Sequence, residues 1–169
     1  MSRATAILGS ALFFVIAPLT IAGFVPWSMT RWRMQEPFFG FWPLRAVGAL
    51  LILPGILVVL ESFARFALQG GGTPAPVAPT QRLVVEGSYR HVRNPIYVAV
   101  VAIILGQGLL FARESLLIYG AILWAGFHVF VLLYEEPTLR ETYGKEYEAY
   151  CASVPRWIPH LRPWRGNVT

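Results

Sequence analysis

Four long apolar runs divide the chain, and the charged residues gather near their ends. The hydrocarbon core of a membrane is about 30 Å thick, which takes about 20 residues of α-helix. The four runs lie at about 7–26, 44–66, 96–112 and 116–134. Since only three residues stand between the last two runs, among them the charged Arg113 and Glu114, we expect a tight antiparallel hairpin there. The pattern predicts an all-α integral membrane protein with about four transmembrane helices.

The first run carries no charge and contains Pro18, which predicts a kink of the kind that membrane helices tolerate. A cleaved signal peptide is the alternative interpretation. The run is long for such a segment, however, and it lacks a small-x-small cleavage site followed by a soluble chain. Near the end of the second run, Glu61 and Arg65 are four residues apart, so they share a helix face and can form an ion pair.

The basic residues are distributed unevenly between the two sides of the membrane that four spans would define. Both termini and the loop between the second and third spans then lie on the same side. That side holds Arg3, Arg65, Arg82, Arg90, Arg93, Arg140, Lys145, Arg156, Arg162 and Arg165, and the other holds Arg31, Arg33, Arg45 and Arg113. This excess predicts cytoplasmic termini, in the inner membrane if the cell is bacterial.

Outside the spans, three features are expected from composition alone. Residues 69–80 are rich in glycine and proline and predict a linker within a single membrane domain of residues 1–169. Residues 135–169 form the predicted cytoplasmic C-terminal segment. Aromatic side chains predict an outer interfacial belt at Trp27, Trp32, Phe38, Phe39, Phe41 and Trp42, and inner anchors at Trp157 and Trp164.

The overall composition fits this picture and excludes several classes of protein. Hydrophobic residues make up 56% of the chain and charged residues only 14%, whereas soluble domains have about a quarter charged residues. A single cysteine, Cys151, excludes a disulfide framework. His91, His128 and His160 are too scattered for a metal site, so no metal is expected. The net charge of +5 is explained by membrane orientation, and we expect no nucleic acid partner.

The segment Gly87–Tyr97 concentrates polar and aromatic side chains at the start of the third run. Pro95 suits the first turn of a helix, and Asn94 is a plausible N-cap. Arg90, His91 and Arg93 therefore crowd a helix N-terminus, which already favours anions. A simple positive anchor that orients the span is the alternative, but the density of Tyr89, Arg90, His91, Arg93, Asn94 and Tyr97 favours a site.

A second polar segment, Glu135–Pro159, follows the fourth run. Pro137 suits the start of a new helix, which we expect to continue to about Ser153. One face of that helix is apolar and rich in tyrosine: Leu139, Tyr143, Tyr147, Tyr150, Cys151 and Val154. Such a helix could simply lie on the membrane surface. The adjacent carboxylates of Glu135 and Glu136 repel one another, so they need a cation or hydroxyl partners, which the arginines of the first segment or a ligand would supply.

Within the predicted membrane, the third run contains Gly106, Gln107 and Gly108, and the fourth contains His128. Glycines in a span usually allow close helix packing, and the alternative is that their bare backbone admits a flat ligand. A polar residue in the membrane is a candidate for function. A structural His128, hydrogen-bonded to Gln107 or to a carbonyl, fits the sequence equally well.

These segments resemble the integral membrane methyltransferases that include isoprenylcysteine carboxyl methyltransferase and the phospholipid N-methyltransferases. The family hallmark reads roughly G-x-Y-x-x-x-R-[HN]-P-x-Y, which is matched by Gly87, Tyr89, Arg93, Asn94, Pro95 and Tyr97. After a hydrophobic hairpin comes E-E-x-x-L-x-x-x-[FY]-G-x-E-Y-x-x-Y, matched by Glu135, Glu136, Leu139, Tyr143, Gly144, Glu146, Tyr147 and Tyr150. The closing VPRWIP, residues 154–159, is similar to the tail of the family, so the resemblance covers roughly the C-terminal half.

The resemblance implies S-adenosylmethionine as methyl donor, bound at the cytoplasmic end of the last two spans and capped by the amphipathic C-terminal helix. The residues that it implies for the cofactor are Tyr89, Arg90, His91, Arg93, Gly106, Gly108, Glu135, Glu136 and Tyr147. Arg93, with Arg90 or His91, would hold a carboxylate, and Glu135 or Glu136 would accept hydrogen bonds from ribose hydroxyls or the amino group. Tyr89, Tyr97 or Tyr147 would face the sulfonium. The catalytic residues expected are Arg93, Asn94 and Tyr97, although Asn94 replaces the histidine usual in eukaryotic prenylcysteine enzymes and cannot act as a base.

The expected acceptor is lipophilic and enters from the bilayer: a prenylcysteine-like carboxylate, a phospholipid amine or a small hydrophobic molecule. An amine would require a base, for which His91 or a glutamate is available. Two other functions compete with methyl transfer. One is a noncatalytic scaffold or small transporter with an ion-pair network at the inner surface. The other is an NADPH-dependent membrane reductase, a class that has a similar C-terminal region but is usually far larger.

Overall fold

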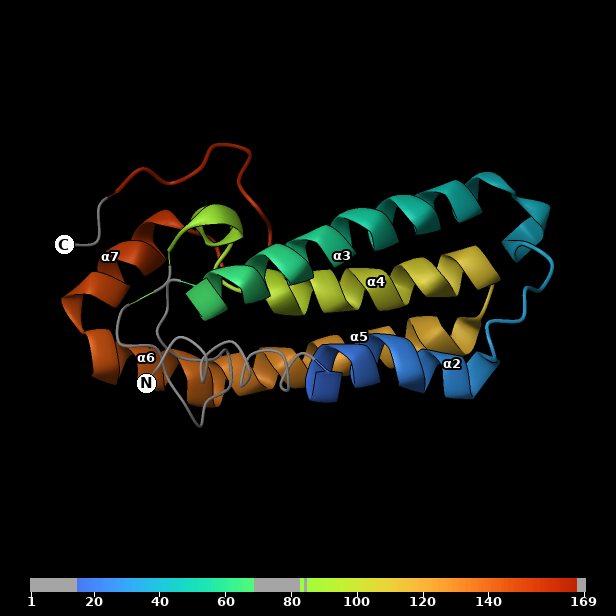
Figure 1. Cartoon of the computed structure of the whole chain (residues 1–169), viewed down its shortest axis with the longest axis horizontal. Coiled ribbons are helices and arrows are strands. Elements are labelled where there is room, and N and C mark those ends of the chain that lie inside the picture. The colour runs from blue at the N-terminus through green and yellow to red at the C-terminus, as the bar shows by residue number, and fades with distance from the viewer. Residues whose placement is uncertain (1–14, 69–82, 84, 167–169) are drawn as a thin grey trace. The chain divides into compact units, whose positions relative to one another are not determined.

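The computed structural model describes residues 15–68, 83 and 85–166, and every regular element among them is a helix (Figure 1). In chain order these are η1 (Val15–Phe24), α2 (Val25–Thr30), η2 (Phe38–Gly40), α3 (Pro43–Leu68), η3 (Gly87–Arg90), α4 (Pro95–Phe111), α5 (Glu114–Phe130), η4 (Val131–Glu135), α6 (Glu136–Tyr143) and α7 (Lys145–Ser153). The helical fold class is thus confirmed for these residues. The linker predicted at 69–80 and the beginning of the run at 7–26 lie outside the described residues.

Among the residues that the structure describes, two helical runs are long and apolar enough to cross a membrane, which is fewer than the four spans predicted. They are Pro43–Arg65, of 23 residues, and Glu114–Tyr143, of 30 residues. Ile16–Thr30 and Pro95–Phe111 are apolar but shorter. A helix of 17 residues, such as α4, extends about 25 Å, somewhat less than the hydrocarbon thickness of about 30 Å.

Pro18 lies inside η1, which is a π-helix rather than a kinked α-helix. Proline has no backbone N–H, so it cannot complete the ordinary i→i−4 hydrogen-bond ladder, and wider turns occur where that ladder is interrupted. The irregularity expected at this position is therefore present in another form.

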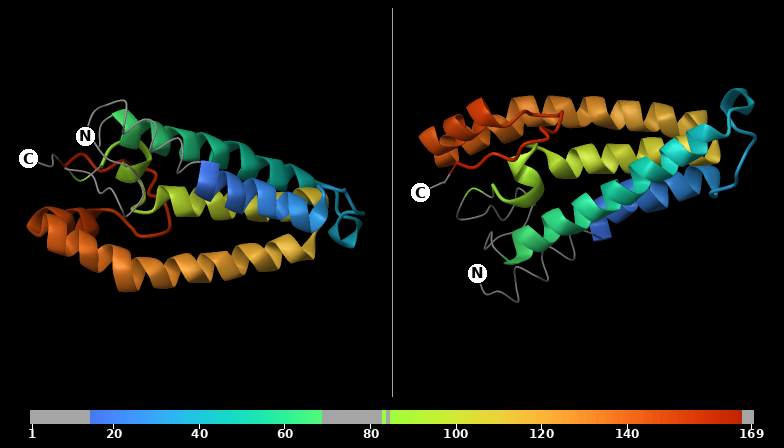
Figure 2. Two further views of the ribbon diagram at one scale, coloured as in Figure 1. Left: turned by 60° about the horizontal axis from the view of Figure 1, so that its bottom comes forward. Right: turned by 90° about the horizontal axis from the view of Figure 1, so that it is seen from above.

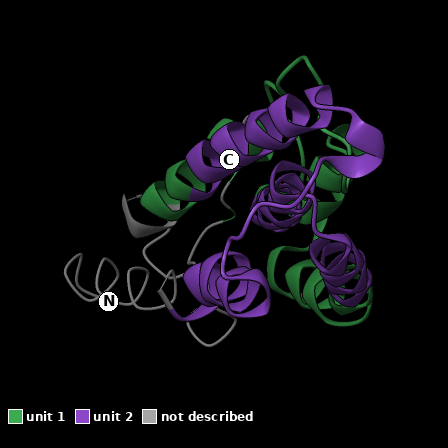
Figure 3. Cartoon of the chain, turned by 90° about the vertical axis from the view of Figure 1, so that its right-hand side faces the viewer, with its two compact units in different colours: residues 1–14, 60–95, 128–169 green, residues 15–59, 96–127 purple. Residues whose placement is uncertain are grey.

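The chain divides into two compact units (Figure 3). Unit 1 comprises residues 1–14, 60–95 and 128–169, and unit 2 comprises residues 15–59 and 96–127.

In unit 2, glycines allow neighbouring helices to pack closely. A Cβ atom on Gly48 of α3 would lie 2.6 Å from the backbone oxygen of Gly106 in α4, so these helices touch through their backbones. The predicted hairpin is confirmed, since α4 ends at Phe111 and α5 begins at Glu114 (Figure 2). Gly108 of α4 packs against Leu117 of α5. Small residues permit this packing in membrane helices.

The amide of Gln107 is satisfied within unit 2. Its Oε1 accepts a hydrogen bond of 3.0 Å from Nε1 of Trp32, and its Nε2 donates to the carbonyl of Ala22 at 2.7 Å. Both polar atoms of a buried amide therefore have partners, as burial requires. Gln107 thus ties α4 to the segments before α3.

In unit 1 the amphipathic face predicted for the C-terminal segment is confirmed, but the helix that carries it is broken. Gly144, with φ of 52° and ψ of −125°, separates α6 from α7, so the single helix expected from Pro137 to Ser153 was wrong. Only glycine adopts this backbone conformation easily. The apolar face packs against the protein's own Val85 and Trp164, which explains its burial without a membrane surface.

Candidate functional site

Arg93 lies between η3 and the first residue of α4, and it joins the two polar segments of the sequence. Its side chain is only 12% exposed. Its Nη1 donates to Oε1 of Glu136 at 2.9 Å and to Sγ of Cys151 at 3.0 Å. Pro95, two residues later in the chain, is the first residue of α4. The first segment is thus connected through one side chain to both α6 and α7.

Glu136, the first residue of α6, accepts hydrogen bonds from two arginines and lies near a third. Its side chain is 5% exposed. Arg156 donates from Nε to Oε1 at 2.6 Å and from Nη2 to Oε2 at 3.0 Å, a bidentate contact, and Nη2 of Arg140 lies 3.9 Å from Oε2. The sequence predicts that arginines of the first segment serve the Glu135–Glu136 pair, and Arg93 confirms this for Glu136.

This cluster carries more positive than negative charge. Three guanidinium groups surround the Glu136 carboxylate, and Nε of Arg93 is buried without a hydrogen-bond partner among the described residues. The hydrogen bond to Glu136 raises the pKa of Arg156, so this side chain stays cationic. A buried donor without a partner is costly, and an anionic ligand would satisfy it.

The segment after α7 runs back along residues 90–94. The Arg93 N–H donates to the carbonyl of Pro155 at 2.9 Å. The side-chain amide of Asn94 donates to the carbonyl of Arg156 at 3.1 Å, so Asn94 is used to hold this segment. His91 participates through its backbone carbonyl, which accepts from His160 N–H at 2.9 Å. The chain around Arg156 is therefore fixed by the residues that flank Arg93.

Tyr147 and Tyr150 of α7 lie beneath this cluster, each 2% exposed. Burial raises the pKa of both phenols, and neighbouring Cys151 raises that of Tyr147 further. The Tyr150 hydroxyl donates to the carbonyl of Tyr89 at 2.6 Å. The two phenols therefore stay protonated and uncharged well above neutral pH.

Alkaline titration should reveal these two tyrosines. Their pKa in the folded protein exceeds that of an unfolded tyrosine, about 10, so their contribution to stability is complete below about pH 10 and is lost as the pH rises further. We expect Tyr147 and Tyr150 to ionise only as the fold is lost, measured by ultraviolet absorbance together with circular dichroism. Ionisation of all seven tyrosines near pH 10 with the helices intact would contradict this.

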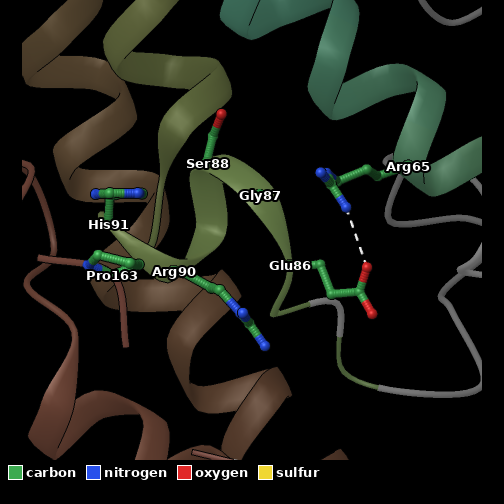
Figure 4. Close-up of a pocket in the computed structure, with 7 residues that line it drawn as sticks. All are labelled: Arg65, Glu86, Gly87, Ser88, Arg90, His91 and Pro163. Atoms are coloured by element: carbon green, nitrogen blue, oxygen red, sulfur yellow. Dashed lines mark hydrogen bonds and ion pairs between the residues drawn. The ribbon is translucent and has the colours of Figure 1, made fainter. Parts of the chain in front are cut away.

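A cavity of about 580 Å³ adjoins η3 in unit 1 (Figure 4). This volume is typical of sites for small molecules, which span about 300–1,000 Å³. Most of its lining is polar: Arg65, Glu86, Gly87, Ser88, Arg90, His91 and Pro163. Arg65 pairs with Glu86 at 3.0 Å and also with Glu61, the pair predicted in the second run. Nε of Arg90 is buried and has no hydrogen-bond partner among the described residues.

The structure brings most of the predicted site residues into one unit. Unit 1 contains Tyr89, Arg90, His91, Arg93, Asn94, Glu135, Glu136 and Tyr147. Tyr97, Gly106 and Gly108 belong to unit 2. There Tyr97 stacks on Phe127 with ring centroids 4.6 Å apart, and Gly106 and Gly108 contact neighbouring helices. For the two glycines, the packing alternative thus has direct structural support.

The sequence did not single out two contributors to this region, Arg156 and Glu86. Arg156, which makes the bidentate contact with Glu136, is the one charge in VPRWIP and could have been noticed for that reason. His128, which the sequence did single out, accepts a hydrogen bond of 3.0 Å at Nδ1 from Nε1 of Trp157, a partner that the sequence did not predict. No spacing pattern in the sequence marks Glu86, and it is identified only because it lines the cavity.

Comparison with known proteins gives one family match. No curated protein gives a significant match to the chain. The family model for phospholipid methyltransferase matches residues 44–146, which is more than half of the chain and includes Arg93, Asn94, Glu135 and Glu136. On this match, the chain belongs to the phospholipid methyltransferase family.

Proposed function

We propose that the chain transfers a methyl group from S-adenosylmethionine to a lipophilic acceptor that enters from the bilayer. The observation that carries the proposal is the convergence of three motif segments on one buried carboxylate. Arg93 of the first, Glu136 of the second and Arg156 of the closing segment are in direct contact. A family of methyltransferases supplies the reaction class, and the apolar helices support a location in a membrane.

The residues of unit 1 fit the proposed donor chemically. When bound, S-adenosylmethionine supplies an electrophilic methyl group on a sulfonium, together with a carboxylate and ribose hydroxyls. The buried and unsatisfied Nε atoms of Arg90 and Arg93 suit a carboxylate. Both oxygens of Glu136 already accept from arginines. We therefore assign Glu136 to orienting these arginines, and the half-buried Glu135 to the ribose hydroxyls.

Methyl transfer from a sulfonium is an in-line displacement that depends on alignment and on a dry site. An acceptor that is already a carboxylate or thiolate needs no base, whereas an amine must lose a proton. His91 is suited to accept that proton. Its Nδ1 lies 2.6 Å from the carbonyl of His160, so Nδ1 carries the hydrogen and Nε2 keeps its lone pair in the neutral ring. We place the site and both termini in the cytoplasm, from the distribution of basic residues.

Calorimetric titration of S-adenosylmethionine and S-adenosylhomocysteine into the detergent-purified protein tests this proposal. We expect saturable binding that Arg93→Ala and Glu135→Ala abolish. Glu141→Ala is the matched control, since Glu141 is an exposed glutamate on α6, and it should leave binding unchanged. A labelled methyl donor with lipid extracts would then identify the acceptor.

Two outcomes would support a competing function, and a third would invalidate the assay. Binding of NADPH in place of the methyl donor would support a membrane reductase. No binding of either molecule to the folded protein would support a noncatalytic scaffold. Loss of methyl-donor binding in Glu141→Ala as well as in Arg93→Ala would show that the assay reports folding rather than the site.

A further inference from the structure

The segment Pro155–Trp164, called here the C-terminal strap, is fixed to unit 1 at several points. Three backbone hydrogen bonds of 2.9 Å join it to residues 90–93. Its Trp164 ring packs on Tyr150, with centroids 5.7 Å apart. Its Trp157 donates to His128. Both tryptophans expected to anchor the inner interface are therefore engaged by the protein itself.

The contact with His128 brings the strap to the side of a membrane helix. His128 lies within the run Glu114–Tyr143, which is long and apolar enough to cross a membrane. It is six residues before Tyr134, where the apolar sequence of the fourth run ends, which corresponds to about 9 Å of helix. The Trp157 ring therefore lies beside a part of that helix within its apolar sequence, and Ile158 is the next residue along the strap.

The strap exposes apolar side chains at this place. Ile158 is 79% exposed and Leu161 is 98% exposed, although the residues between and around them are fixed to the protein. Next to Leu161 are basic side chains that are also exposed: His160, Arg162 and Arg165. Apolar side chains beside cations are the composition that inserts into a leaflet with anionic lipids.

We propose that Ile158 and Leu161 insert into the cytoplasmic leaflet, with Arg162 and Arg165 binding the phosphates of anionic lipids. The strap is then a membrane-inserted loop, and a lipid surface is the partner of its outer face. Pro163 of the strap also lines the cavity beside Arg90, so the lipid bilayer holds one wall of that cavity in place. This inference concerns the membrane and does not depend on the proposed reaction.

The test measures how deeply the strap lies in lipid. Leu161→Cys, in a Cys151→Ala background, is labelled with an environment-sensitive fluorophore and reconstituted in phosphatidylcholine vesicles with or without phosphatidylglycerol. We expect blue-shifted emission that lipids with nitroxide-labelled chains quench, more strongly with phosphatidylglycerol. Glu148→Cys is the matched control, since it is also exposed and lies on α7, and it should report water. Arg162→Gln with Arg165→Gln should remove the dependence on phosphatidylglycerol.

Because Cys151 contacts Arg93, a second measurement keeps the native cysteine. A benzophenone side chain replaces Leu161 in the full chain, and the cross-linked products are identified by mass spectrometry. Lipid adducts are expected. Aqueous emission at position 161, equal to that at position 148, would overturn the proposal, and so would cross-linking to a second copy of the chain or to another protein in place of lipid.

Discussion

Replacing Glu136 with alanine is expected to lower the stability of the protein by about 3–5 kcal/mol, because it leaves buried guanidinium groups without their counter-charge. The Arg93 side chain is 12% exposed and that of Arg156 is 30% exposed, so water can compensate them only in part. Thermal unfolding of the detergent-purified protein, followed by tryptophan fluorescence, measures the effect. Binding of S-adenosylmethionine should be lost in the same variant, since Glu136 orients both arginines.

Glu141→Ala provides the comparison for this prediction. Glu141 is an exposed glutamate on the same helix, α6, and replacing an exposed side chain usually changes stability by less than about 0.5 kcal/mol. Equal melting temperatures for Glu136→Ala and Glu141→Ala would show that the arginine cluster does not contribute to stability, and the role assigned to Glu136 would then be wrong.

Arg93→Lys separates an ion-pair network from a binding site. A lysine retains the charge toward Glu136 but not the planar fork of donors that also reaches Cys151. A scaffold needs only the charge, so it would tolerate this change fully. If the protein instead uses the Nε donor of Arg93 to bind a ligand, the Arg93→Lys variant will keep much of its stability but will bind the methyl donor more weakly.

The local features of this chain could be predicted from its sequence because they depend on neighbours in the chain. The Glu61–Arg65 pair and the hairpin around Arg113 need only helix geometry and run length. The apolar face that includes Tyr147 and Tyr150 follows from spacing of three and four residues. A contact between Glu136 and an arginine such as Arg93 was also predicted, since paired carboxylates need cations.

The features that the sequence did not predict depend on residues far apart in the chain or on backbone conformation. Arg156 meets Glu136 over a separation of 20 residues, and Trp157 meets His128 over 29. No periodic pattern marks either pair. The break at Gly144 could have been suspected from the glycine itself, but helical spacing continues on both sides and conceals it. Two of the four spans remain a prediction, because α4 is short for a bilayer and the run at 7–26 begins outside the described residues.

The two interpretations of the glycines in α4, close helix packing and admission of a flat ligand, can be separated best at Gly106. A Cβ atom at Gly106 would lie 2.7 Å from the backbone oxygen of Gly48, and one at Gly48 would lie 2.8 Å from the backbone nitrogen of Leu110. Backbone atoms cannot rotate away as a flexible side chain can, so the two helices must separate. We expect Gly48→Ala and Gly106→Ala each to cost about 1–3 kcal/mol of stability.

Gly126→Ala is the matched control for these variants, because its Cβ in α5 would have no neighbour within 4 Å among the described residues, apart from the adjoining backbone of its own helix. There the gain in helix propensity of up to about 1 kcal/mol should act alone, so stability should rise or stay the same. Melting temperatures and binding of S-adenosylmethionine, measured on the same preparations, separate the two interpretations. If Gly106 serves packing, Gly48→Ala and Gly106→Ala will both melt earlier. If Gly106 instead admits the cofactor, Gly106→Ala will keep its melting temperature and lose binding, while Gly48→Ala binds normally. The shared backbone contact between these two glycines favours the first result, since a ligand explains Gly106 but gives no reason for a glycine at position 48.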